Sequence, residues 1–106
     1  MFIAYEVSLD LIRQLRPIVA LIAARDPSLA DQLQRAASSA SLNLAEGRRR
    51  SGADRTRMYR IGAGSAAEAR AALDVALAWQ LADDAPLAAA RATADRVLGL
   101  LWPLTR

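Results

Sequence analysis

The chain has 106 residues and a net charge of +3, with neither cysteine nor histidine. This length suits one domain, residues 1–106, that buries its own core, and the lack of thiols excludes a disulfide framework and thiolate chemistry. Without histidine the chain also lacks the commonest general base and the commonest metal ligand. We therefore expect no catalytic residues, no metal and no cofactor, and the sequence predicts a protein that is not an enzyme.

Alanine dominates the apolar composition. Hydrophobic residues make up 54% of the chain, and 25 of them are alanine, the best helix former. The longest uninterrupted apolar run, Ile18 to Ala24, is too short to cross a bilayer, and the N-terminus lacks the pattern of a secretory signal. We expect an all-α protein of the cytoplasm that has no contact with a membrane.

The first periodic segment runs from about Ile3 to Ala24. Its apolar residues recur at intervals of three and four, as in an amphipathic helix: Val7, Leu11, Leu15, Ile18 and Ile22. Pro17 would cost about 3 kcal/mol inside an unbroken helix, so we expect a bend or break near Gln14 to Arg16. A break would divide the fold into five helical pieces.

The second helix begins with a strong local signal. Asp26 can cap the helix N-terminus, and Pro27 suits the first helical position because its missing donor is not needed there. The residues predicted to face inward are spaced alternately four and three apart, and Gly47 is expected to end the helix. The stripe consists of Leu29, Leu33, Ala36, Ala40 and Leu44.

The third helix is expected to begin near Gly52 or Ala53 and to end near Leu81. Ser51 and Asp54 have the spacing of a capping box. The predicted inward stripe consists of Met58, Ile61, Ser65, Ala69, Ala72 or Leu73, Ala76 and Gln80. Gly62 and Gly64 weaken this helix by roughly 1 kcal/mol each, so we expect them to allow close packing of another helix.

The fourth helix is predicted from about Pro86 to Trp102, with Pro103 closing it. Its inward residues are Leu87, Ala90, Ala94, Val97 or Leu98, and Leu101. Short connections make consecutive helices antiparallel, so the sequence predicts an up-down-up-down antiparallel four-helix bundle. Both chain ends and the loop after the second helix would then lie at the same end.

Arginine provides all fourteen basic residues, and seven of them lie between Arg35 and Arg60. Only Glu46 and Asp54 oppose them there, which leaves a local net charge of +5. Codon bias explains the use of arginine in place of lysine, and the run could be an ordinary solvated loop. The clustering instead favours a polyanionic partner, because guanidinium groups form bidentate contacts with phosphate or carboxylate. The candidate nucleic-acid-binding residues are Arg48, Arg49, Arg50, Arg55, Arg57 and Arg60.

Two short stretches resemble the signatures of one family. They are Asn43-Leu44-Ala45-Glu46-Gly47 and Gly64-Ser65-Ala66-Ala67-Glu68, separated by the basic loop. Together they resemble the 23S rRNA intervening-sequence proteins, a four-helix-bundle family that includes the accessory proteins of diversity-generating retroelements. The looser likeness extends from about Tyr5 to Leu101 and departs from the family pattern at Leu42, Gly62 and Pro17.

By likeness to the retroelement accessory proteins, the resemblance implies a homo-oligomer, a pentamer by analogy, that binds RNA or DNA and a reverse transcriptase. From the residues alone, we expect Asn43, Glu46, Ser65 and Glu68 to form a buried or interfacial polar network. Trp79 and Trp102 are expected in the core or at a subunit interface, since neither is near the arginine loop in sequence. The leading hypothesis is a nucleic-acid-binding accessory protein; the alternative is a homo-oligomeric protein-interaction scaffold with no nucleic-acid role.

Overall fold

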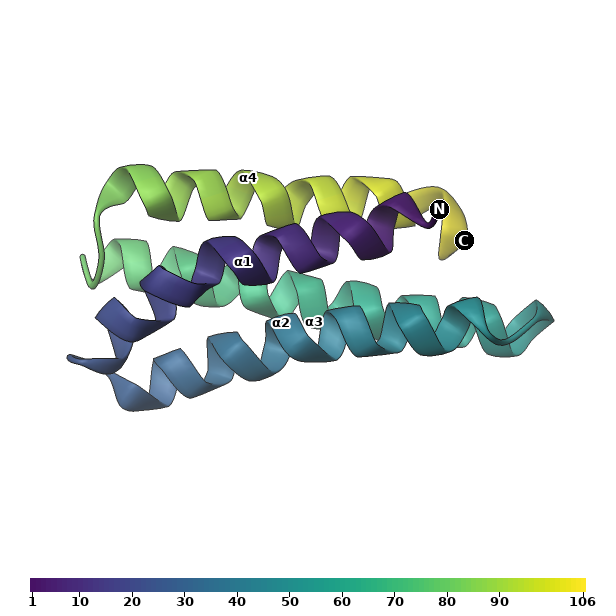
Figure 1. The fold of residues 1–106 in the computed structure, drawn as a ribbon, viewed down its shortest axis with the longest axis horizontal. Helices are drawn as coiled ribbons and strands as arrows, with labels where there is room; N and C mark the ends of the chain where they lie inside the picture. The colour runs from purple at the N-terminus through teal and green to yellow at the C-terminus, as the bar shows by residue number, and fades with distance from the viewer.

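The computed structural model describes residues 1–106 and contains four long helices. They are α1 (Ile3–Ala23), α2 (Pro27–Arg48), α3 (Gly52–Ala78) and α4 (Asp84–Leu101), followed by one 3₁₀ turn, η1 (Trp102–Leu104). Consecutive helices pack against each other and α1 packs against α4, which closes an antiparallel four-helix bundle (Figure 1). The predicted fold class is confirmed. None of the helices carries an apolar stretch long enough to span a bilayer.

Two clusters of buried apolar side chains fill the bundle. The larger lies toward the α1–α2 and α3–α4 loops and includes Leu15, Leu33, Leu73 and Leu87. The smaller lies toward the chain ends and is built from Ala4, Val7, Ala40, Leu44, Tyr59, Ala66, Val97 and Leu101. Every apolar residue predicted to face inward on α1 and α2 is buried.

Helix α1 continues through Pro17, so of the expected bend or break the break does not occur, and the fold has four helices. Pro17 lies on the exposed face of α1, while Leu15 and Ile18 beside it are 3% and 2% exposed. Burying one aliphatic side chain contributes about 1.5–3 kcal/mol. Two such side chains offset the cost of a proline inside the helix.

The start of α2 is as predicted, but its end is not. The Asp26 carboxylate accepts a hydrogen bond from Leu29 N at 3.0 Å, and Pro27 is the first helical residue. Gly47 does not stop the helix, which continues to Arg48. Gly47 is buried, and a Cβ atom there would lie 2.6 Å from Tyr59 Cε1. This glycine therefore permits close contact between α2 and α3.

Helix α3 begins at Gly52, as predicted, although without the expected capping box. The Ser51 side chain makes no capping hydrogen bond, and Asp54 instead pairs with Arg50 at 3.5 Å. The chain reverses at Gly52, whose φ of +57° lies in the left-handed region that favours glycine.

The inward stripe of α3 is only partly as predicted. Ile61 is 39% exposed, Ser65 is half-buried and Gln80 is exposed, whereas Tyr59, Gly62 and Ala66 are among the residues that face the core. Gly62 does allow close packing, since an added Cβ would lie 2.9 Å from Leu44 Cδ2. A Cβ on Gly64 would meet nothing within 4 Å, so the packing prediction is wrong for that glycine within this chain.

The connection from α3 to α4 differs from the prediction at both ends. Helix α3 ends at Ala78, and Gln80 takes a left-handed φ of 55°. Helix α4 begins at Asp84, with Pro86 inside its first turn, where a missing backbone donor costs nothing. Trp79 and Trp102 are 70% and 62% exposed, so neither belongs to the core of this chain.

We predict that Gly47→Ala and Gly99→Ala have different effects on stability. A Cβ at position 99 meets nothing within 4 Å, so alanine there gains up to about 1 kcal/mol of helix propensity. At position 47 the Tyr59 ring must move, and overpacking of this kind costs about 1–3 kcal/mol. In urea unfolding at one chain concentration, the free energy of unfolding of Gly47→Ala should be about 1–3 kcal/mol lower than that of Gly99→Ala. Equal free energies would contradict the close contact between Gly47 and Tyr59.

Candidate nucleic-acid interface

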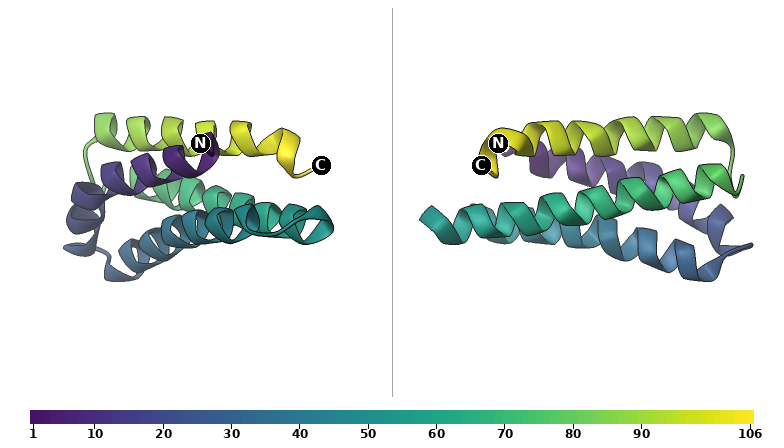
Figure 2. Two further views of the ribbon diagram at one scale, coloured as in Figure 1. Left: turned by 45° about the vertical axis from the view of Figure 1, so that its right-hand side comes forward. Right: turned by 180° about the vertical axis from the view of Figure 1, so that it is seen from behind.

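The α2–α3 hairpin extends beyond the other two helices, and we call residues 48–57 the hairpin tip. Phe2 packs against Tyr59 with ring centroids 5.2 Å apart, and Arg60 Nε donates a hydrogen bond to Thr105 O at 2.7 Å. These contacts bring both chain ends level with Tyr59 and Arg60. The hairpin tip therefore lies past the termini and has no third helix beside it (Figures 1 and 2).

Arg50 is the most constrained of the three consecutive arginines. Its Nε donates to Glu46 Oε1 at 3.1 Å, and its Nη1 reaches Asp54 Oδ2 at 3.5 Å. Arg49 has a longer contact, 3.8 Å to the same glutamate, and its side chain is 81% exposed. Exposed pairs of this kind contribute about 0–1 kcal/mol, so Arg49 can leave its partner at little cost.

Arg55 has a structural role at the end of α2. Its Nε donates to Gly47 O at 3.2 Å, and its Nη2 donates to Arg48 O at 3.1 Å. The last carbonyl groups of a helix have no partner within the helix and carry partial negative charge. Arg55 donates to two of them from the first turn of α3 and so ties the two helices together across the loop; Gly47 O also accepts from Arg50 N at 3.0 Å.

The six predicted arginines thus divide into two groups. Arg50, Arg55 and Arg60 are held by carboxylates or carbonyls of the chain itself. The side chains of Arg48 and Arg57 are exposed and make no hydrogen bond or ion pair, and that of Arg49 is nearly as accessible. The structure therefore leaves three arginines of the hairpin tip available to an external anion.

The predicted polar network is only partly assembled. Asn43 Nδ2 donates to Ser39 O at 2.8 Å, and Ser39 Oγ lies 2.9 Å from Ser65 Oγ, which joins α2 to α3. Glu46 is not part of this chain of contacts, because it pairs with Arg50 and Arg49. Glu68 is exposed and makes no hydrogen bond or ion pair.

The sequence analysis did not identify a buried polar contact between α1 and α2. Ser8 Oγ donates to Tyr5 O at 2.6 Å and lies 2.8 Å from Ser41 Oγ. Both serines are buried, at 1% and 5% exposure, and each finds a partner in the other. Their positions on the inward faces of two predicted helices were the only available signal.

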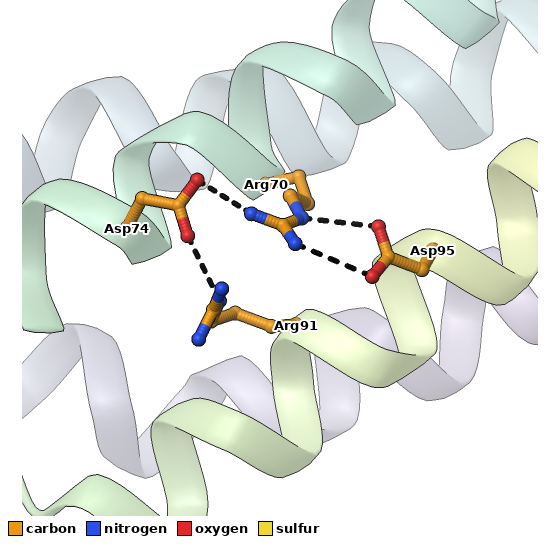
Figure 3. A network of polar contacts seen from close by, with 4 residues as sticks. All are labelled: Arg70, Asp74, Arg91 and Asp95. Carbon is orange, nitrogen blue, oxygen red and sulfur yellow. Dashed lines mark hydrogen bonds and ion pairs between the residues drawn. The ribbon is translucent and has the colours of Figure 1, made fainter.

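A second group of charges joins α3 to α4 (Figure 3). Arg70 contacts both Asp95 oxygens, at 3.0 and 3.4 Å, and also donates to Asp74. Arg91 Nε lies 2.8 Å from the other Asp74 oxygen in an ion pair that is too bent to be a hydrogen bond. Two arginines and two aspartates are thus connected in the order Arg91, Asp74, Arg70, Asp95.

This group is a poor anion site because its charges balance. The hydrogen bond with Asp95 is the main cause that raises the pKa of Arg70 above its ordinary value; partial burial opposes the rise, and Asp74 adds to it. Arg70 thus stays charged and remains paired with the carboxylates beside it. The excess positive charge of the molecule lies at the hairpin tip instead.

Comparison with known proteins agrees with this architecture. A family model described as 23S rRNA-intervening sequence protein matches residues 2–102. The chain belongs to this family. The family resemblance drawn from the two signature stretches is thereby confirmed.

One solved structure with the same fold is a protein of unknown function from the S23 ribosomal protein family of Bacteroides thetaiotaomicron. It shares 16% sequence identity with a TM-score of 0.87, over 97% of this chain and 98% of that one. At this identity the likeness shows the four-helix fold alone. A comparison with curated proteins found no match.

We predict that Arg55→Ala destabilises the chain and that Arg57→Ala does not, because only the Arg55 side chain bonds to the chain itself. Arg55→Ala leaves Arg48 O without a donor and removes the side-chain bond to Gly47 O, which keeps the backbone N–H of Arg50 at 3.0 Å, so it should lower the free energy of unfolding by about 1–2 kcal/mol. Arg57→Ala removes no contact, so the change should stay within about 0.5 kcal/mol. Urea unfolding measures both. Equal losses would show that the Arg55 bonds do not stabilise the hairpin.

Proposed function

We propose that this family member is a non-enzymatic accessory protein that binds RNA or DNA by its phosphates through the hairpin tip. The observation that carries the proposal is the exposure of Arg48, Arg49 and Arg57 on a segment that projects beyond the bundle. Guanidinium groups on an overhanging two-helix hairpin can be approached from several sides. A nucleic-acid backbone is long and repeats its charge, so it can contact all three.

The charge of the hairpin tip supports this proposal. Residues 48–57 contain five arginines and one carboxylate, Asp54, and carry a net charge of +4. Glu46 pairs with Arg50 and Arg49 from the end of α2, and even with this carboxylate counted the excess is +3. Phosphate contacts release counterions from the nucleic acid, so the affinity should fall steeply as salt increases.

We predict that the triple variant Arg48→Ala, Arg49→Ala, Arg57→Ala binds labelled oligothymidine more weakly and with a smaller salt dependence. Each lost contact to a single strand lowers the slope of log affinity against log salt by about 0.7, so three lost contacts lower it by about 2. Fluorescence anisotropy at several salt concentrations measures this slope.

The matched control is the triple variant Arg13→Ala, Arg16→Ala, Arg96→Ala, which removes the same charge from exposed positions on α1 and α4. Its slope should change by less than that of the tip variant. Equal changes in the two variants would mean that net charge alone attracts the nucleic acid. If the tip variant retains full binding, the hairpin tip is excluded as the nucleic-acid-binding site. An acidic protein surface would then be favoured as the partner of these arginines.

We also propose that the chain assembles into a homo-oligomer, for which the family resemblance implies five copies. The support within this chain is an exposed stripe along α3 formed by Ile61, Gly64, Ala71, Val75 and Ala78. Ile61 and Val75 are 39% and 43% exposed, and Glu68 is the one charge that interrupts the stripe. Small and apolar residues on an open helix face suit contact with another copy.

We predict that Ala71→Glu with Val75→Glu lowers the mass of the assembly in solution toward that of one chain. Carboxylates placed on a self-contacting face lose water and repel each other across it. Ala88→Glu with Ala92→Glu, on the exposed face of α4, is the control that should leave the mass unchanged. Light scattering after size exclusion distinguishes the two. A wild-type mass of one chain would refute the assembly.

A further inference from the structure

Trp102 begins the η1 turn after α4, near the C-terminus, at the end of the bundle where the hairpin tip lies (Figure 1), although it is 42 residues beyond Arg60 in sequence. Thr105 Oγ donates to Trp102 O at 3.2 Å, while Thr105 O accepts from Arg60 Nε at 2.7 Å. The tryptophan backbone is therefore tied to α3 beside Arg60, where the overhang of the hairpin begins.

Basic side chains continue from the hairpin tip toward this tryptophan. Arg57 and Arg60 are three residues apart on α3, so they share one face of the helix. The Arg57 side chain is unpaired, and it lies one turn nearer Arg48 and Arg49 at the end of α2. A single backbone can contact these arginines and then reach the end of α4 without crossing the bundle.

The Trp102 ring is open to a partner. It is 62% exposed, with the guanidinium of Arg106 placed 5.0 Å from the ring centroid. The ring thus combines an accessible aromatic surface with a cation that attracts phosphate. Proteins that bind single-stranded nucleic acid use this combination, because bases stack on aromatic rings and on guanidinium planes.

Trp79 provides a comparison within the same molecule. It is 70% exposed, yet it follows α3 at the opposite end, where Asp83 and Asp84 begin the next helix and Asp26 caps α2. One arginine also lies there, since Arg25 Nη1 donates to Gln80 O at 2.9 Å, but the three aspartates outnumber it and repel phosphate. Exposure of an indole alone therefore does not suggest a base-stacking site; the excess of arginines over carboxylates distinguishes Trp102.

We infer that Trp102 stacks on an unpaired base of a nucleic acid whose backbone lies on the hairpin-tip arginines, so that the chain prefers single strands to duplex. This inference rests on the proposed function and adds the substrate class to it. In a duplex the faces of the bases are covered by their neighbours. Only a single strand, or an unpaired segment, offers a base face to the ring.

The test compares Trp102→Ala, Trp102→Phe and Trp79→Ala with the wild-type chain. Two ligands are used: oligothymidine and a covalently closed circular duplex, which has no exposed terminal bases. Loss of one stacked base should weaken oligothymidine binding by Trp102→Ala about 5- to 100-fold. Binding of the circular duplex should change less than about twofold, since it depends on phosphate contacts alone. Trp102→Phe should keep most of the affinity, and Trp79→Ala should keep all of it.

A second measurement does not depend on how Trp102→Ala folds. In the Trp79→Phe variant Trp102 is the one remaining tryptophan. Its fluorescence should be quenched by oligothymidine and unchanged by the circular duplex.

Several outcomes would overturn the inference. Unchanged oligothymidine affinity in Trp102→Ala, or equal loss for both ligands, would leave the phosphate site in place without a stacking residue. A lower mass for Trp102→Ala in light scattering would instead make Trp102 a contact between copies. If the wild-type chain binds neither ligand, the proposed function and this inference fail together.

Discussion

The close contact between α2 and α3 is the constraint on which the rest of this molecule depends. Tyr59 packs over Gly47, and Leu44 packs over Gly62, at separations that leave no room for a Cβ atom on either glycine. Helices α1 and α4 end before the hairpin does, so these contacts must support its last turns with little help. A short helical hairpin is marginal in water unless packing holds it together. The glycines supply that packing at the base of the arginine-rich segment.

Charge repulsion within the hairpin tip is reduced by groups of the chain itself. Glu46 and Asp54 flank Arg50, and two carbonyls at the end of α2 accept hydrogen bonds from Arg55. These contacts use some arginines to fold the loop and leave others exposed, so one basic cluster both stabilises the hairpin and presents charge to solvent. The division between the two uses follows from helix geometry: adjacent residues in a helix point about 100° apart, and only some face the carboxylates and carbonyls.

The number, order and direction of the helices could be predicted because local signals separate them, above all Asp26-Pro27 and the glycines around the arginine run. The buried face of α3 was harder, because Gly62 and Ala66 face inward while Ile61 does not, and small residues give little hydrophobic contrast. The distinction between Arg55 and Arg57 depends on where α3 begins. The predicted topology already places both chain ends at the same end as the arginine loop. The bond from Arg60 to Thr105, which holds the turn at Trp102 against α3, depends on tertiary packing that no local pattern encodes.

The charge group between α3 and α4 has a consequence for helix register. Each helix carries one arginine and one aspartate four residues apart, and the antiparallel arrangement pairs Arg70 with Asp95 and Asp74 with Arg91. A slip of one helical turn in one direction would place Arg70 opposite Arg91. A slip in the other direction would place Asp74 opposite Asp95. An alanine-rich seam is smooth enough to slide, and these four side chains make both neighbouring alignments repulsive.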